Sequence, residues 1–390
     1  MPGFVYPNEV AIEWDLLITI YPYITGLVAG AFVVSSLYHF FGLTRLKPVS
    51  RFSLVTALAF LLVTPLPLLL HLGRPERAME MLLTPNLVSA MSGFGYIWMF
   101  YLLLVLGEVW LVYRSDIVRY AESSEGIRKG IYSILALGVY DVSEETIAVD
   151  KKLIKVLSLI GIPAAFLLHG YVGFIFGAVK ANPWWSTPLM PIIFLLSAIV
   201  SGIALLIVMY AVITKIRKAS LDHACLRAMA LWLSGFLSLA IVVEGLEVVS
   251  MLYESEESWG AVSQLITQKI AFSYFGIQLV LGSLLPLFVL GTVEVSALAE
   301  KVKTSLRIIA AGSVLIGVFA MRWNVVIGGQ MLSKSLRGFI DFSPPIFGLS
   351  GILVGMAMLL LPFVVFGVII YLLPPWEQEA RPPERRRLSF

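Results

Sequence analysis

The sequence predicts an all-α protein, a polytopic transmembrane helix bundle of about nine spans, and three observations carry that prediction. Hydrophobic residues make up 59% of the 390 residues and charged residues only 14%, whereas soluble domains carry roughly 25% charged residues. The apolar residues form long unbroken runs, unlike the alternating pattern of a transmembrane β-barrel. Lysine and arginine cluster at alternate ends of these runs, as the positive-inside rule predicts for a helix bundle.

Nine runs are long enough to cross a membrane, because a helix needs about 20 mainly apolar residues to span a hydrocarbon core about 30 Å thick. Several runs contain Pro or Gly, which neighbouring helices in a bundle tolerate. We expect the spans near residues 15–41, 52–72, 88–113, 153–178, 189–214, 228–253, 270–298, 308–331 and 349–373. They form a single transmembrane domain over 1–375, and we expect the tail 376–390 to be cytoplasmic and disordered.

The basic residues predict that the N-terminus lies outside and the C-terminus in the cytoplasm. With this orientation, 21 of the 28 Lys and Arg residues fall in inner loops or the tail, as the positive-inside rule requires. The longest polar stretch, 114–152, then becomes a cytoplasmic loop that contains a short interfacial helix. The acidic N-terminal stretch has no basic region ahead of an apolar one, so we expect no cleaved signal peptide.

Composition and spacing argue against several kinds of site. A formal net charge of +3 gives no reason to expect a nucleic-acid partner. The single cysteine, Cys225, excludes an internal disulfide and a cluster ligated by cysteines of this chain alone. HxxxH spacings, P-loops and dinucleotide-binding glycine motifs are missing. His71 ends a span whereas His169 lies about 13 Å inside another, which disfavours a bis-histidine haem, so we expect no haem or metal on this chain.

Ionisable side chains within spans are costly and usually face a bundle interior or a water path, so each is a candidate for function. Glu244 and Glu247 lie three residues apart and share one helix face. They are candidates for proton handling, as is Glu108 in the third span. The alternative for one of the first two is a structural ion pair with Arg322.

Toward the outer side, the candidates are histidines and aromatic residues. His169 and Tyr171 lie in the fourth span, and His71 ends the second. Each histidine is alternatively structural, either as a satisfied hydrogen-bonding partner or as an interfacial cap. Tyr21 and Tyr23 alternatively belong to an aromatic belt. Trp184 and Trp185 are most simply interface anchors.

Three segments in order resemble the NrfD-like family, the membrane subunits of polysulfide reductase and related enzymes. The segment HLGRPERAMEMLLTPNLVSAMSGFGYIW at 71–98 resembles the family's signature after the second helix. A histidine, an aromatic-glycine segment and the loop NPWWSTP at 182–188 follow in the expected order. RWNVVIGGQ at 322–330 resembles a C-terminal element of longer members. Together they cover most of the chain from the first to the eighth span.

The resemblance implies a quinone-binding anchor subunit of a respiratory oxidoreductase complex in the cytoplasmic membrane. Such a subunit exchanges electrons between the menaquinone or related pool and an extracytoplasmic partner, as in polysulfide, tetrathionate or thiosulfate reductases. The implied partners are a four-cluster ferredoxin-like iron–sulfur subunit and a molybdopterin catalytic subunit. Quinol oxidation also needs a proton acceptor beside the ring, for which His169, Glu108, Glu244 and Glu247 are the candidates.

The resemblance also places the quinone pocket near the outer surface, between the first and fourth helices. It implies Tyr21, Tyr23, His169 and Tyr171 as lining residues, with His71 nearby. The family pattern of an Asn and a His on the first helix is missing from ITIYPYITGLVAG, so the tyrosines would have to replace them. For partner docking, the implied residues are Arg74, Arg77, Trp184 and Trp185.

Two other functions remain open. A secondary transporter would be expected to show matching inverted halves and charges at the membrane midplane, and the sequence offers neither. A purely structural anchor without its own quinone site differs from the first interpretation only in ligand binding, so copurified quinone would distinguish the two.

Overall fold

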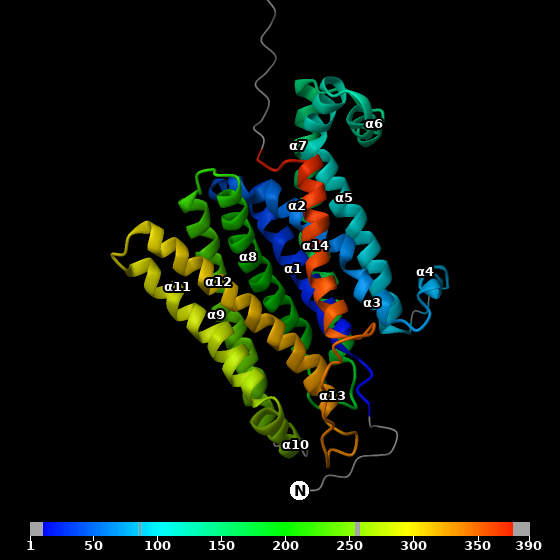
Figure 1. The fold of residues 1–390 in the computed structure, drawn as a ribbon, viewed down its shortest axis with the longest axis vertical. Helices are drawn as coiled ribbons and strands as arrows, with labels where there is room; N and C mark the ends of the chain where they lie inside the picture. The colour runs from blue at the N-terminus through cyan, green and yellow to red at the C-terminus, as the bar shows by residue number, and fades with distance from the viewer. Residues whose placement is uncertain (1–10, 85, 87, 254–257, 377–390) are drawn as a thin grey trace, which may run out of the picture.

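A computed structural model describes residues 11–84, 86, 88–253 and 258–376. These residues form a helical bundle in which nine helices are long and apolar enough to cross a membrane, which confirms the predicted fold class (Figure 1). The N-terminal end of the bundle, where α1 (Leu16–His39) begins, lies opposite the C-terminal end, where α14 (Ile352–Leu372) finishes. One isolated antiparallel bridge pairs Leu332 with Phe339.

Helix α1 is the central element of the bundle. Asp15 caps its start, because a carboxylate oxygen accepts a hydrogen bond from the backbone N–H of Leu17 at 2.8 Å. The helix is apolar and buried almost all round, as expected of a helix enclosed by others. It packs against α2 (Lys47–Val63), α7 (Glu144–Gly177) and α8 (Met190–Ile216). The second predicted span continues as α3 (Pro65–His71), after a break at Thr64.

Helices α5 (Ala90–Ser123) and α7 have 34 residues each. At 1.5 Å per residue each is about 51 Å long, well beyond the thickness of the hydrocarbon core. The expected loop at 114–152 is therefore largely a helical hairpin, with α6 (Gly126–Leu135) between the two long helices. A buried ion pair at 2.6 Å between Arg114 and Asp150 ties the hairpin together.

The second half of the bundle contains three π-helical segments: η3 (Leu265–Lys269), η4 (Phe272–Leu284) and η5 (Asn324–Gly328). The segments η3 and η4 lie between α9 (His223–Tyr253) and its short continuation α10 (Trp259–Gln264) on one side, and α11 (Leu285–Val295) on the other. The third interrupts the end of α12 (Glu300–Trp323) and is followed by α13 (Gly329–Met331). Because π-helices are rare and often occur at functional sites, this half is where a site is expected.

Two pairs of glycines allow helix backbones to touch. A Cβ built on Gly202 of α8 would lie 2.4 Å from the Cα of Gly30 in α1, and a Cβ on Gly282 of η4 would lie 2.2 Å from the Cα of Gly317 in α12. Any side chain at these positions would push the backbones apart. Lipid tails are as apolar as leucine side chains, so no hydrophobic force drives helices together in a membrane. Small residues let the backbones approach closely, and the resulting packing holds the helices together.

We therefore expect Gly202→Ala to destabilise the bundle by about 1–3 kcal/mol, because overpacking forces the backbones to shift. Gly312→Ala is the matched control, since a Cβ there meets nothing within 4 Å and alanine favours the helix. Thermal unfolding in detergent measures both variants. Equal melting temperatures for the two would contradict the close packing of α1 on α8.

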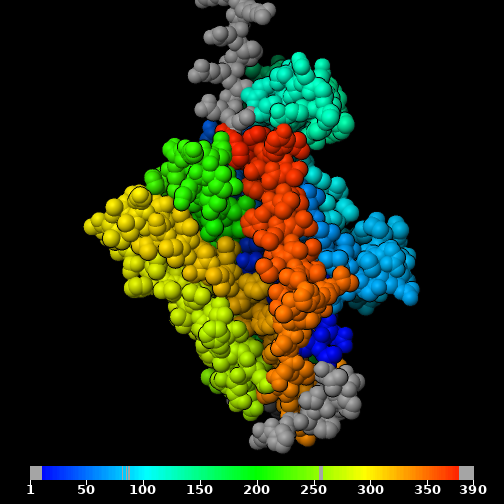
Figure 2. Space-filling model, in the orientation of Figure 1, coloured from blue at the N-terminus to red at the C-terminus, as the bar shows by residue number. Residues whose placement is uncertain are grey.

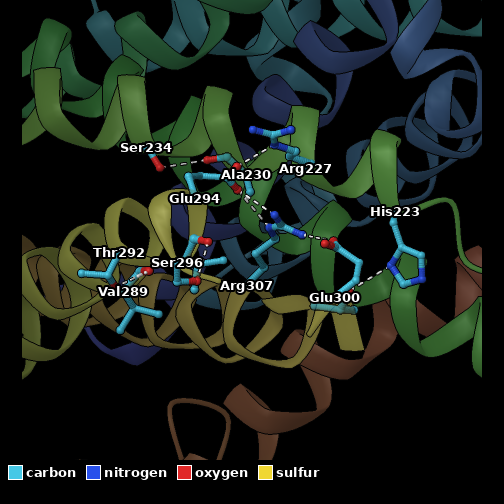
Figure 3. Close-up of polar contacts among 12 residues, drawn as sticks. His223, Arg227, Ala230, Ser234, Val289, Thr292, Glu294, Ser296, Glu300 and Arg307 are labelled. Atoms are coloured by element: carbon cyan, nitrogen blue, oxygen red, sulfur yellow. Dashed lines mark hydrogen bonds and ion pairs between the residues drawn. The ribbon is translucent and has the colours of Figure 1, made fainter. Parts of the chain in front are cut away.

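In the second half of the bundle, a cluster of charges joins α9, α11 and α12 (Figure 3). The Arg307 side chain is only 1% exposed, and its guanidinium donates to Glu294 at 2.8 Å and to Glu300 at 2.7 Å. Glu294 also pairs with Arg227 at 2.6 Å. His223 contacts the Thr304 hydroxyl at 3.0 Å nearby.

Because Arg307 is the buried member of this cluster, Arg307→Leu should cost about 2–3 kcal/mol of stability, close to the lower end of values for breaking a buried pair. Lys301→Leu, an exposed change in the same helix, should leave the unfolding temperature nearly unchanged. If unfolding scans find the two variants alike, the cluster does not hold these three helices together.

Candidate functional site

A crevice that encloses about 50 Å³ of free space opens between α8, α9, η4 and the end of α12. It lies toward the N-terminal end of the bundle, beside the loop that joins α7 to α8. Its walls are mostly apolar and aromatic, with two carboxylates and two amides among them. The lining residues are Trp184, Met190, Ile193, Glu244, Glu247, Val248, Met251, Tyr274, Gln278, Met321, Asn324 and Val325.

Hydrogen bonds join the polar side chains of the crevice into a chain. The Ser273 hydroxyl donates to Asn324 Oδ1 at 2.5 Å, and Asn324 Nδ2 donates to Gln278 Oε1 at 2.9 Å. Gln278 Nε2 then donates to Glu244 Oε2 at 3.0 Å. The chain therefore ends on a carboxylate at the crevice wall. Three of its four members belong to the π-helices η4 and η5.

The second carboxylate is held from the loop before α8. Thr187 donates its hydroxyl to Glu247 Oε2 at 2.8 Å. Glu244 and Glu247 both line the crevice, as expected of two residues on one helix face.

The two tryptophans of this loop are buried rather than presented at the surface. Trp184 Nε1 donates to the Asn324 carbonyl at 3.0 Å, and Trp185 Nε1 donates to the Val325 carbonyl at 2.6 Å. Both acceptors lie in η5, so the indoles hold the loop against that π-helix. Trp14 stacks on Trp185, with ring centroids 5.2 Å apart. The simple interpretation as interface anchors does not match this geometry, and any role in docking would act through the loop backbone.

Behind the crevice wall, Arg322 of α12 and His169 of α7 form a fully buried pair. Arg322 Nη2 lies 3.0 Å from His169 Nε2 and donates to the Ser197 hydroxyl at 2.7 Å. The guanidinium also lies 3.9 Å from the centroid of the Phe194 ring, a favourable cation–π distance. Within the described ranges, no ion pair joins Arg322 to Glu244 or Glu247, so the structural alternative for these two carboxylates is not realised.

The other residues predicted to line the quinone pocket contact two different helices. Tyr21 packs edge-on against Phe94 of α5 at 5.1 Å, and the Tyr171 hydroxyl lies where a side chain at Gly93 would be. Tyr23 instead donates to the Leu315 carbonyl of α12 at 3.2 Å. The two tyrosines of α1 therefore face different helices.

Two further candidates lie apart from the crevice. His71 Nδ1 lies 3.4 Å from the Asp15 carboxylate at the start of α1. Glu108 is buried between α5 and α7, where it accepts a hydrogen bond from Ser158 at 2.7 Å.

The predicted docking arginines lie on a segment that projects from the side of the bundle, visible around α4 (Glu80–Leu83) in Figure 2. Arg74 and Arg77 are both exposed. Arg77 pairs with Glu80 at 2.8 Å, and hydrogen bonding to the guanidinium holds the pKa of the Glu80 carboxyl below its ordinary value. The arm, defined as residues 71–89, also exposes the apolar side chains of Leu83 and Val88.

Sequence reasoning missed most of the crevice. Tyr274 and Gln278 lie in an apolar run, where the amide of Gln278 was the only sign of a polar site. Asn324 falls within the RWNVVIGGQ segment, but its spatial neighbours come from other helices. Among the described residues, no group of three or more His, Cys, Asp or Glu could hold a metal ion.

The fold and the buried polar network define the class of protein, a multi-pass membrane protein with a polar crevice inside an apolar bundle. Its sequence matches the family described as polysulphide reductase, NrfD, over residues 7–333. The chain therefore belongs to the NrfD family.

Two relatives match nearly the whole chain, and a third matches about half of it. The chain is 28% identical to the C subunit of the selenate reductase of Mesobacillus selenatarsenatis, over 94% of this chain and 87% of that protein. It is 24% identical to the Hdr-like menaquinol oxidoreductase integral membrane subunit of Archaeoglobus fulgidus, over 93% and 86%. Protein NrfD of Escherichia coli is 26% identical over 55% of this chain and 63% of that protein.

The buried pair yields a prediction. We expect His169→Ala to lower stability by about 1–3 kcal/mol, because it removes an acceptor from a buried guanidinium. His169→Gln can still present an oxygen acceptor and should recover part of the loss. His71→Ala, at a partly exposed helix end, is the control. Thermal melts in detergent test the series, and a His169→Ala protein as stable as wild type would show that Arg322 does not need the imidazole.

Proposed function

We propose that this chain is the quinone-reactive membrane subunit of a respiratory reductase complex. It would exchange electrons between the menaquinone or related pool and an iron–sulfur partner subunit. The single observation that carries the proposal is the crevice, which combines apolar walls with a hydrogen-bonded chain ending on a carboxylate. Membership of the NrfD family and the names of the relatives, which include reductase and menaquinol oxidoreductase subunits, support it.

The crevice residues fit the chemistry of a quinone ring. Trp184, Tyr274 and Met251 offer flat or adaptable apolar surface for a ring. Gln278 and Asn324 each carry a second amide N–H beyond the one used in the chain, which could donate to a quinone oxygen.

Quinol oxidation releases two electrons and two protons, so a proton acceptor must lie beside the ring oxygens. Glu244 is the best-placed acceptor, because it lines the crevice and ends the hydrogen-bonded chain. Glu247 is the second. We assign His169 an indirect role, since it contacts Arg322 behind the wall rather than the crevice itself. Glu108 would serve a separate proton path between α5 and α7.

This assignment replaces the pocket expected between the first and fourth helices. Tyr21, Tyr23, Tyr171 and His71 would then shape the α1 side of the bundle instead of holding the ring. The reason is geometric, because Tyr21 and Tyr171 lie against the start of α5, whereas Tyr23 contacts α12 and His71 contacts Asp15.

The proposed partner side is the N-terminal end of the bundle, which the distribution of Lys and Arg assigns to the extracytoplasmic side of the cell membrane. The crevice and the arm with Arg74 and Arg77 both lie toward this end. A four-cluster ferredoxin-like subunit docked there would receive the electrons and pass them to a molybdopterin catalytic subunit. If this subunit docks over the loop that Trp184 and Trp185 hold in place, the distance between its iron–sulfur cluster and the quinone ring would be short.

The test is Glu244→Gln in the assembled complex. Loss of a positioned proton acceptor should lower quinol-dependent turnover by roughly 10²-fold or more, while the amide preserves the hydrogen bond to Gln278 in one orientation. Glu145→Gln, an exposed change on α7, should leave turnover unchanged. Assembly is checked by copurification of the partner subunits.

Full quinol-dependent turnover in an assembled Glu244→Gln complex would rule out the proposed proton acceptor. If the purified wild-type complex holds no quinone and binds no quinone analogue, the chain is a structural anchor instead.

A further inference from the structure

Helix α6 carries an apolar face that points away from the rest of the protein. Ile127 and Ile134 of α6 are 84% and 74% exposed, and Leu137 in the turn that follows is 69% exposed. At 100° per residue, Ile127 and Ile134 lie within about 20° of one another on the helix. Tyr132 and Ala136, on the other side of the helix, are buried against the bundle. Exposed apolar side chains that share one face indicate contact with lipid or with a partner.

Specific contacts fix this orientation of α6. The Tyr132 hydroxyl donates to the carbonyl of Leu372, at the end of α14, at 2.8 Å. Trp110 of α5 donates from its indole N–H to the Leu135 carbonyl at 2.9 Å. The Tyr132 ring lies 4.9 Å from that of Tyr120. These three contacts on the inner side of α6 fix which side of the helix points away from the bundle.

These contacts also fix the height of α6 relative to the membrane. Helix α14 has 21 residues and is just long enough to cross the hydrocarbon core, so its end at Leu372 marks one boundary. Figures 1 and 2 show α6 just past this end of α14, on the side away from the middle of the bundle. Tyr371 precedes Leu372 in α14 and Tyr132 contacts Leu372, and such aromatic residues are enriched where hydrocarbon meets headgroups. Arg128 lies over the Tyr371 ring at 5.4 Å.

Basic residues flank the apolar face. Arg128 and Lys129, which follow Ile127 on α6, are exposed. They put two positive charges beside the apolar face. Acidic headgroups would complement this charge, and each basic residue near an anionic surface strengthens attraction.

We propose that α6 is a membrane-surface helix. Its face formed by Ile127 and Ile134, together with Leu137 of the following turn, inserts among acyl chains, and its basic flank binds anionic phospholipid headgroups. The helix folds back from the tip of the α5–α7 hairpin and so fastens that extension to the bilayer. A partner protein would explain the apolar face but not why α6 contacts the end of α14, where a membrane boundary is expected. The inference does not depend on the proposed quinone site.

Depth-dependent fluorescence quenching of the full chain in lipid nanodiscs tests the proposal. Ile134→Cys places a fluorophore on the outward face of α6, and Glu145→Cys places one near the hairpin tip as the matched control. The native Cys225 is buried, and unsubstituted protein serves as the labelling blank. Quenchers are phospholipids with nitroxide-labelled acyl chains and, from the water phase, iodide.

At position 134 we expect the acyl-chain nitroxide to quench at least about twofold more strongly than iodide, because the interfacial helix buries this face. Position 145 should show the reverse order. Labelled phosphatidylglycerol should quench position 134 at least about twofold more than labelled phosphatidylcholine at equal mole fraction. Adding Arg128→Gln and Lys129→Gln should remove this difference but leave the acyl-chain quenching.

Iodide quenching at position 134 as strong as at position 145, with no effect of labelled lipid, would overturn the proposal and leave the face to water or a protein partner. If the two labelled lipids quench position 134 equally in protein that keeps Arg128 and Lys129, the proposed binding of anionic headgroups is overturned.

Discussion

The bilayer cannot hydrogen-bond, so every polar group that this bundle carries into the membrane needs a partner within the protein. This constraint explains the arrangement of the second half. The π-helices turn Ser273, Gln278 and Asn324 toward one another, and their side chains form one continuous chain. The Trp184 and Trp185 indoles in turn donate to carbonyls of η5. A crevice with polar walls can exist here because the surrounding network is already connected.

The same constraint separates two buried charge systems with different environments. Arg322 lies deep between α7, α8 and α12, where a histidine, a serine hydroxyl and an aromatic face replace water. Arg307 lies near the C-terminal end and pairs directly with two carboxylates. The second arrangement is that of a structural clasp. Arg322 lies behind the wall of the crevice that we propose binds quinone. Its buried positive charge therefore acts on any charge that forms in the crevice.

The sequence predicted the nine-span bundle because length and apolarity decide membrane insertion, and the RWNVVIGGQ and NPWWSTP segments do meet in space through Trp184 and Asn324. It could not predict which face of each helix turns inward. Tyr21 and Tyr23 are two residues apart on a helix, so they were bound to diverge, and their contacts to α5 and α12 show it. Gln278 escaped notice because its role depends on neighbours from α9 and η5. The polar stretch 114–152, predicted as a loop, is mainly helical because α5 and α7 are both longer than a membrane span.

The central claim is that the quinone ring binds between α8, α9, η4 and α12. Photo-crosslinking with an azido-quinone, followed by peptide mapping of the assembled complex, tests it most directly. The account predicts labelled peptides that contain Met190, Met251 or Tyr274, with labelling suppressed by excess unmodified quinone. Suppressible labelling confined to α1 and α7 around Tyr21 and Tyr171, with none on the crevice walls, would contradict it.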